Sequence, residues 1–127
     1  MPAPSDRRYS ETHEWFLDQN GTMTIGITKF AVDELTDITY VAMKPKGTKV
    51  RSGESIGEVE SVKATSDVYA ALDGEIIEVN PALEGDPSLV NTDPYGRGWL
   101  VKLKAADSKA LGKLMDAAAY NAKYPTA

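Results

Sequence analysis

Lys63 is the only base in a strongly acidic stretch of the chain, and its chemistry is the first to consider. Residues 54–78 contain seven acids and this one base. The acids are Glu54, Glu58, Glu60, Asp67, Asp73, Glu75 and Glu78. Nearby carboxylates favour the ammonium form of a lysine, which is a poor nucleophile. The pattern therefore favours a displayed lysine that a separate enzyme acylates, although a solvated sheet face would explain the acids equally well.

The chain has no cysteine, and His13 is its one histidine. This composition excludes disulfides, thiolate metal sites, thiol nucleophiles and sites with several histidine ligands. We therefore expect no metal site, and any thiol or redox chemistry must come from a cofactor or a partner.

The length of 127 residues predicts a single domain over residues 1–127. No apolar run approaches the roughly 20 residues of a membrane span. The net charge is −5, and it is concentrated in the stretch around Lys63. Such acidity opposes binding to nucleic acid or to a membrane surface and favours basic protein partners. We expect a cytoplasmic bacterial protein, or a mitochondrial matrix protein if the chain is a processed eukaryotic one.

Short strands separated by Gly and Pro turns dominate the hydrophobic pattern. The predicted strands span residues 22–27, 38–43, 55–62, 66–71, 75–79 and 98–103. Short helices are predicted at 29–35 and from Pro81, with Asn80 as the cap. This pattern predicts an antiparallel sandwich or barrel in which Lys63 lies at the tip of a hairpin.

A C-terminal helix is predicted over about residues 107–120, because apolar side chains recur there at helical spacing. These are Leu111, Leu114, Met115 and Ala118. We expect this apolar stripe to pack against the sheet.

Six stretches, in order along residues 9–120, carry a family resemblance. They include His13-Glu14-Trp15, Glu58-Val59-Glu60-Ser61-Val62-Lys63-Ala64 and Asp93-Pro94-Tyr95-Gly96. The others lie at 26–28, 74–80 and 98–100, with 66–69 continuing the lysine motif and 89–91 preceding Asp93. The sequence resembles the glycine cleavage H-protein family. The resemblance implies a mainly β sandwich-barrel hybrid of the lipoyl/biotinyl-domain type, with short helices and a C-terminal helix.

In that family Lys63 matches the lysine to which a lipoylating enzyme attaches (R)-lipoate. The resemblance implies a monomeric carrier in glycine catabolism and one-carbon metabolism that catalyses no step itself. It would collect an aminomethyl group from glycine decarboxylase (P protein) and deliver it to aminomethyltransferase (T protein). Dihydrolipoyl dehydrogenase (L protein) would then reoxidise its swinging arm.

The loaded arm would end in a primary amine, and acceptors on this chain would have to shield it. The resemblance points to a cleft near residues 13–15, so we expect Glu14 to be an acceptor, with Thr12 and Asp67 as weaker candidates. The alternative is that Glu14 is an ordinary surface carboxylate. For His13 we expect a structural hydrogen bond and no role as a general base.

Departures from the family pattern include Thr36, where glycine is usual. Others are Lys29-Phe30 and the stretch 71–73 before Gly74. They affect local turns and leave the lysine motif intact.

Four alternative functions remain open. A biotinyl carrier usually places its lysine between methionines, whereas Val62 and Ala64 flank Lys63. A lipoyl domain of a 2-oxoacid dehydrogenase is not expected to contain the 13–15 and 93–96 stretches. An H-like lipoyl donor or relay for other complexes is a further alternative. A stand-alone lysine enzyme would be active without modification.

Overall fold

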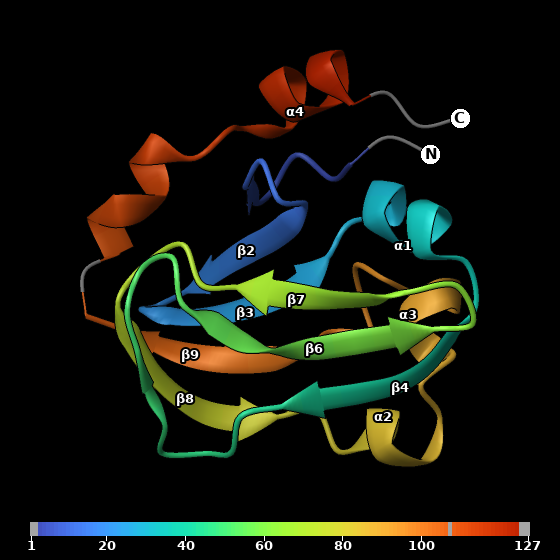
Figure 1. The fold of residues 1–127 in the computed structure, drawn as a ribbon. Coiled ribbons are helices and arrows are strands. Elements are labelled where there is room, and N and C mark those ends of the chain that lie inside the picture. Colours follow the sequence, from blue (N-terminus) through green and yellow to red (C-terminus); the bar gives the residue numbers. More distant parts are fainter. Residues whose placement is uncertain (1–2, 107, 125–127) are drawn as a thin grey trace.

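A computed structural model of the chain describes residues 3–106 and 108–124. Two antiparallel sheets form its body (Figure 1). The first, sheet A, has the order β1-β2-β3-β9-β8-β5, and the second, sheet B, has the order β4-β6-β7. The strands of sheet A are β1 (Arg8–Tyr9), β2 (Glu14–Gln19), β3 (Thr22–Ile27), β5 (Lys49–Val50), β8 (Gly74–Val79) and β9 (Val101–Ala105). Those of sheet B are β4 (Ile38–Met43), β6 (Ser55–Ser61) and β7 (Thr65–Tyr69).

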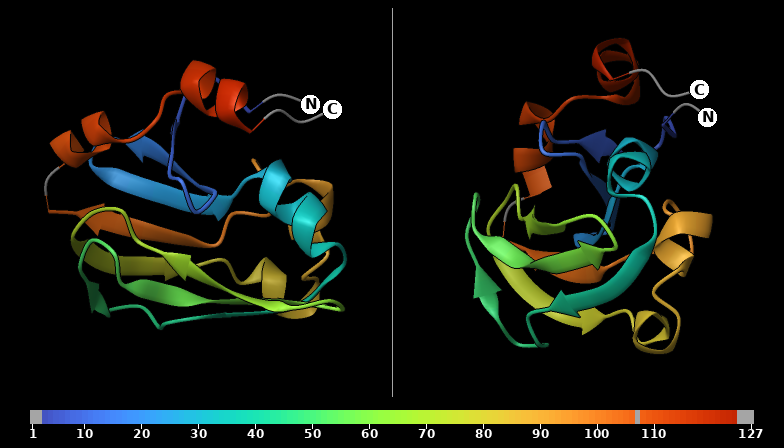
Figure 2. Two further views of the ribbon diagram at one scale, coloured as in Figure 1. Left: turned by 45° about the horizontal axis from the view of Figure 1, so that its top comes forward. Right: turned by 45° about the vertical axis from the view of Figure 1, so that its right-hand side comes forward.

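Sheet B lies across sheet A (Figure 2). Both sheets contribute residues to the main hydrophobic core. Phe16 and Ile25 enter this core from sheet A, and Ile56 and Val59 enter it from sheet B. From Gly57 to Glu60 buried and exposed residues alternate along β6, as expected for a strand with one buried face. The mainly β class and the two-layer architecture predicted from the sequence are confirmed.

Four short α-helices and a 3₁₀ helix complete the described part of the fold. They are α1 (Lys29–Leu35), α2 (Ala82–Gly85), α3 (Leu89–Thr92), the 3₁₀ helix η1 (Ser108–Lys113) and α4 (Ala117–Lys123). The side chain of Thr28 caps α1 by accepting from the backbone N–H of Ala31. The backbone N–H of Ala82 donates to Asn80 Oδ1 at the start of α2, as the sequence predicted for Asn80.

The prediction of one continuous helix over residues 107–120 is wrong in its described part. η1 ends at Lys113, and α4 begins only at Ala117. The intervening Met115 pairs with Tyr9 through two backbone hydrogen bonds of 2.8 and 3.0 Å, and Asp116 caps the new helix. This break rotates the buried face, so that Ala118, predicted to pack inward, is exposed.

The strand predicted at 98–103 is also shifted, since β9 begins at Val101. The residues before it are used in a turn, where the N–H of Gly98 donates to Asp93 O and that of Trp99 donates to Gly96 O. β1, β2, β5 and α3 were not predicted. Within the described ranges, no helix is long and apolar enough to cross a membrane.

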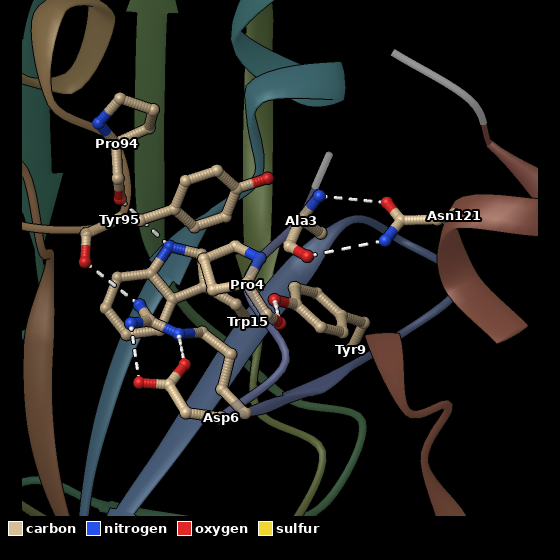
Figure 3. A network of polar contacts seen from close by, with 9 residues as sticks. Ala3, Pro4, Asp6, Tyr9, Trp15, Pro94, Tyr95 and Asn121 are labelled. Carbon is tan, nitrogen blue, oxygen red and sulfur yellow. Dashed lines mark hydrogen bonds and ion pairs between the residues drawn. The ribbon is translucent and has the colours of Figure 1, made fainter. Parts of the chain in front are cut away.

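A network of polar contacts fixes the segment before β1 against β2 (Figure 3). The Arg7 guanidinium lies 4.7 Å from the ring centre of Trp15 and donates to Tyr95 O at 2.9 Å. The indole N–H of Trp15 donates to Pro94 O at 2.9 Å. On β3 the opposite residue is Gly26, where a Cβ would lie only 2.5 Å from the Trp15 ring. The 93–96 turn and the Trp15 segment are therefore parts of one packed unit.

Candidate functional site

A tight turn at the end of the β6–β7 hairpin presents Lys63. The last paired residues are Glu60 and Thr65, and Ser61 N–H then donates to Ala64 O at 2.8 Å. The Ser61 hydroxyl oxygen accepts from the backbone N–H groups of Lys63 and Ala64 at 3.2 and 3.0 Å. A serine that binds the backbone two and three residues ahead stabilises a turn of this kind. Lys63 is accordingly exposed at the predicted hairpin tip.

The ammonium of Lys63 donates to the backbone carbonyl of Glu34 at 3.0 Å. This carbonyl belongs to the last turn of α1, where the helix dipole favours a cation. The neighbouring Val62 N–H donates to Asp37 O at 3.1 Å and so ties the tip to the segment after α1. Within residues 3–106 and 108–124 no ion pair involves Lys63.

The acids that surround Lys63 in the sequence do not surround it in space. Glu75 and Glu78 lie on β8 in sheet A. On the outer face of sheet B, Glu58 lies opposite Asp67, and both are exposed. Like charges on opposite strands cost stability. The outer face of sheet B therefore carries negative charge at this pair.

Glu14, at the start of β2, is buried, with only 1% of its surface exposed. Its Oε1 accepts hydrogen bonds from the hydroxyls of Ser10, at 2.5 Å, and Thr12. Its Oε2 accepts from the backbone N–H of Tyr69, at 3.1 Å. The alternative that Glu14 is an ordinary surface carboxylate is therefore wrong.

Burial raises the pKa of the Glu14 carboxyl above its ordinary value of 4.5. The hydrogen bonds from Ser10, Thr12 and Tyr69 act in the opposite direction, because each favours the ionised form. The site thus combines a buried acid with three donors directed at its two oxygens.

These groups line an open groove of about 550 Å³. Its walls are formed by Ser10, Thr12, Glu14, Ser52, Gly53, Tyr69, Ala70, Ala71 and Leu114. The structure thus brings together two of the expected shielding residues, Glu14 and Thr12. Asp67 is not among the lining residues and lies two positions before Tyr69 on β7.

Ser10 and the backbone of Tyr69 belong to this site, and sequence reasoning missed both. Residue spacing did not reveal Ser10, because residues 10–13 form a turn in which His13 N–H donates to Ser10 O, and this turn brings the Ser10 hydroxyl to Glu14. Nothing in the sequence indicated Tyr69, because its contact is made by a backbone N–H from the other sheet.

His13 has the structural hydrogen bond expected of it, with Nδ1 lying 2.8 Å from the Tyr120 hydroxyl. Its ring packs between Phe30 and Tyr124, with centroid distances of 4.6 Å to each. Among the residues that the structure covers, no cluster of His, Asp or Glu could hold a metal ion.

The lysine hairpin and the groove lie at the two ends of β7. Lys63 precedes Thr65, the first residue of β7, and Tyr69, the last, lines the groove. Four residue steps along a strand span about 13 Å. A group carried on Lys63 and folded along the outer face of β7 would therefore be directed toward Glu14.

Comparisons with known proteins agree with this arrangement. The glycine cleavage H-protein family matches residues 7–126. The glycine cleavage system H protein of Marinobacter nauticus is 51% identical over 118 residues, which cover 92% of this chain and 91% of that protein. The H protein of Thermus thermophilus is 50% identical over 120 residues and 94% of each chain.

The fold agrees with a solved structure as well. The crystal structure of a glycine cleavage system H protein from Mycobacterium marinum superposes with a TM-score of 0.88 at 40% identity. The match covers 95% of this chain and 98% of that one. With this fold, and with relatives similar over almost their whole length, the chain belongs to the glycine cleavage H-protein family, the lipoyl carriers of the glycine cleavage system.

Proposed function

We propose that Lys63 is the attachment point of (R)-lipoate. The observation that carries this proposal is the presentation of Lys63, exposed at a hairpin tip whose turn is held by Ser61. A lipoylating enzyme could reach Nζ by displacing a single hydrogen bond to Glu34 O. When bound, the lipoyl group supplies the redox-active pair of sulfur atoms that this cysteine-free chain lacks.

Acylation would convert the Lys63 ammonium into a neutral amide. The side chain would then lose the charge that favours its place at the carbonyl end of α1. The hairpin surface, with exposed Glu58 and Asp67, would become one charge more negative. Both changes favour release of the side chain from Glu34 and recognition of the modified carrier by basic partner surfaces.

The groove at the far end of β7 would receive the amine of the carried aminomethyl group. Glu14 supplies a carboxylate acceptor there, and Ser10 and Thr12 supply hydroxyl oxygens that retain lone pairs for a further donor. We propose Glu14 and Thr12 as shielding residues. Asp67 would be an acceptor along the path, because it is exposed on β7 between Lys63 and the groove.

The partners in this scheme are the P, T and L proteins, and the chain is a single-domain, non-catalytic monomer over residues 1–127. Tethering to Lys63 raises the effective concentration of the carried group at each enzyme. The named relatives are bacterial, which supports a cytoplasmic location.

Intact-mass measurement and peptide mapping, after coexpression with a lipoylating enzyme, test the attachment. We expect one lipoyl amide, on Lys63, and none in Lys63→Arg, which keeps the charge but is not a substrate for acylation. Lys46→Arg, which changes another exposed lysine, is the matched control and should be lipoylated normally. Lipoylation elsewhere, or a biotinyl group on Lys63, would overturn the proposal.

A further inference from the structure

The hydroxyl of Tyr120, on α4, occupies a buried position between His13, which precedes β2, and Thr28, which follows β3. It lies 2.8 Å from His13 Nδ1 and 2.8 Å from Thr28 Oγ1. Only 1% of Tyr120 is exposed, and its ring stacks on Tyr9 with a centroid distance of 4.8 Å. Burial raises the pKa of Tyr120 to about 12, so its hydroxyl stays protonated at neutral pH.

The two partners of Tyr120 lie at the end of the β2–β3 ladder, directly beside Glu14. The final pair of that ladder is Glu14 with Ile27. Thr28 N–H then donates to His13 O at 2.9 Å and extends the pairing by one residue. Tyr120 therefore binds the segment before β2 and the segment after β3, next to Glu14, the first residue of β2.

His13 adopts a conformation that needs such support. Its φ is +73°, in the left-handed region that a residue with a side chain seldom occupies. The N–H of His13 donates to Ser10 O at 3.1 Å, within the same loop that aims the Ser10 hydroxyl at Glu14. A change in the His13 backbone would move Glu14 and its hydroxyl donors together.

The segment that carries Tyr120 also forms part of the groove. Leu114 lines the groove, and the next residue, Met115, pairs with Tyr9. At the other end of α4, Asn121 Oδ1 accepts from Ala3 N–H at 2.9 Å (Figure 3). The C-terminal segment is thus anchored on both sides of Tyr120, with one end at the wall of the groove.

We propose that Tyr120 is a positioning residue which, through His13 and Thr28, holds the Glu14 carboxylate in place at the groove and so sets how well the groove shields the carried amine. This inference rests on the shielding role proposed above for Glu14. It adds that the C-terminal helix, far from Glu14 in the sequence, controls that role.

Amide hydrogen exchange at Tyr69 measures the position of Glu14 without any cofactor, because this N–H donates to Glu14 Oε2. The test compares the unmodified full chain with Tyr120→Phe, which keeps the buried ring and removes only the hydroxyl. We expect exchange at Tyr69 to accelerate by about threefold to tenfold, the range set by the net contribution of one hydrogen bond. The nitrogen resonances of the single histidine, His13, should shift as well.

The same variants are then compared as lipoylated, aminomethyl-loaded proteins. We expect Tyr120→Phe to lose the aminomethyl group faster than the wild type, with a smaller effect than Glu14→Ala. Tyr40→Phe is the matched control, since it removes a hydroxyl from a tyrosine that is 55% exposed on β4. It should leave both rates unchanged.

Unchanged exchange at Tyr69 in a folded Tyr120→Phe protein would overturn the positioning role. So would unchanged loss of the aminomethyl group in Tyr120→Phe when Glu14→Ala accelerates it. If Glu14→Ala has no effect, the shielding role itself fails, and exchange at Tyr69 still decides whether Tyr120 positions Glu14. If Tyr120→Phe does not fold, His13→Asn removes the imidazole partner of the Tyr120 hydroxyl instead. Asparagine tolerates the positive φ at this position. This variant too must accelerate exchange at Tyr69.

Discussion

Glu14 and Tyr69 join the two sheets beside the groove. Glu14 is the first residue of β2 in sheet A, and Tyr69 is the last residue of β7 in sheet B. The Glu14 carboxylate accepts a hydrogen bond of 3.1 Å from the Tyr69 backbone N–H. A backbone donor at the free edge of a sheet is usually left to water. Here the Tyr69 N–H orients the buried Glu14 carboxylate, and β7 connects Tyr69 to the hairpin tip that carries Lys63.

Replacing Glu14 by alanine should hasten the spontaneous loss of the aminomethyl group from the loaded carrier. The amine would lose its only charged acceptor among the groove residues, and a hydrogen bond to a charged group contributes about 1.5–3 kcal/mol. That range corresponds to an acceleration of roughly tenfold to a hundredfold. The measurement is the decay of loaded protein by mass spectrometry, with Glu84→Ala, an exposed acid on α2, as the control. A decay rate equal to that of the wild type would rule out the shielding role.

His13 should make the protein less stable as the solution becomes acidic. Burial keeps the pKa of His13 below its ordinary value of 6.5, although nearby Glu34 acts in the opposite direction. The folded state therefore binds this proton less readily than the unfolded state does. Its contribution to stability is complete above about pH 6.5 and decreases as the pH falls toward the folded-state pKa.

An NMR titration of this single histidine should have its midpoint below pH 6.5. In urea unfolding between about pH 7.5 and 5.5, the wild type should lose more stability than His13→Asn, which cannot titrate. A midpoint above 6.5 would contradict the burial of the neutral ring.

Thr36→Gly should stabilise the protein. Thr36 ends α1 with φ 66° and ψ −140°, a conformation that is strained for a β-branched residue and accessible to glycine. Relief of such strain should stabilise the folded state by about 1–3 kcal/mol. Glycine also increases the conformational entropy of the unfolded chain, which offsets part of this gain. Urea unfolding should therefore show a net gain of about 1 kcal/mol. Thr65→Gly, at an exposed strand position without a positive φ, should instead lose stability; equal losses in both variants would contradict the argument.

Lys63→Gln should change the free energy of unfolding by less than about 1 kcal/mol, because an exposed contact of this kind contributes little. The carbonyl ¹³C resonance of Glu34 should nevertheless shift, since its donor at 3.0 Å is replaced. Lys63→Arg retains a cationic donor and should shift it less. A loss of several kcal/mol would mean that Lys63 holds the fold together and is not free for acylation.

The sequence by itself predicted the elements whose signals are local. The alternation in 22–27 and the β-branched run in 38–43 became β3 and β4 with the predicted bounds. The hairpin beneath Lys63 was equally clear, because two strand-like runs flank the short segment that contains Lys63. The motifs that carry the family resemblance were readable for the same reason, since each is continuous in the chain.

Tertiary structure decided the features that depend on distant partners. The C-terminal segment had helical spacing throughout, yet pairing between Met115 and Tyr9 divided it, because a backbone bridge competes with continued helix. The acidic stretch that singled out Lys63 separated onto two sheets once the strands paired.

Glu14 could be named from the sequence, but its environment could not. Its burial and its bond to Tyr69 required the packing of sheet A against sheet B. Local patterns specify backbone conformation through the spacing of apolar residues and through turn chemistry. Which polar groups meet is settled by the folded chain as a whole, because each buried group must find a partner wherever the topology brings one.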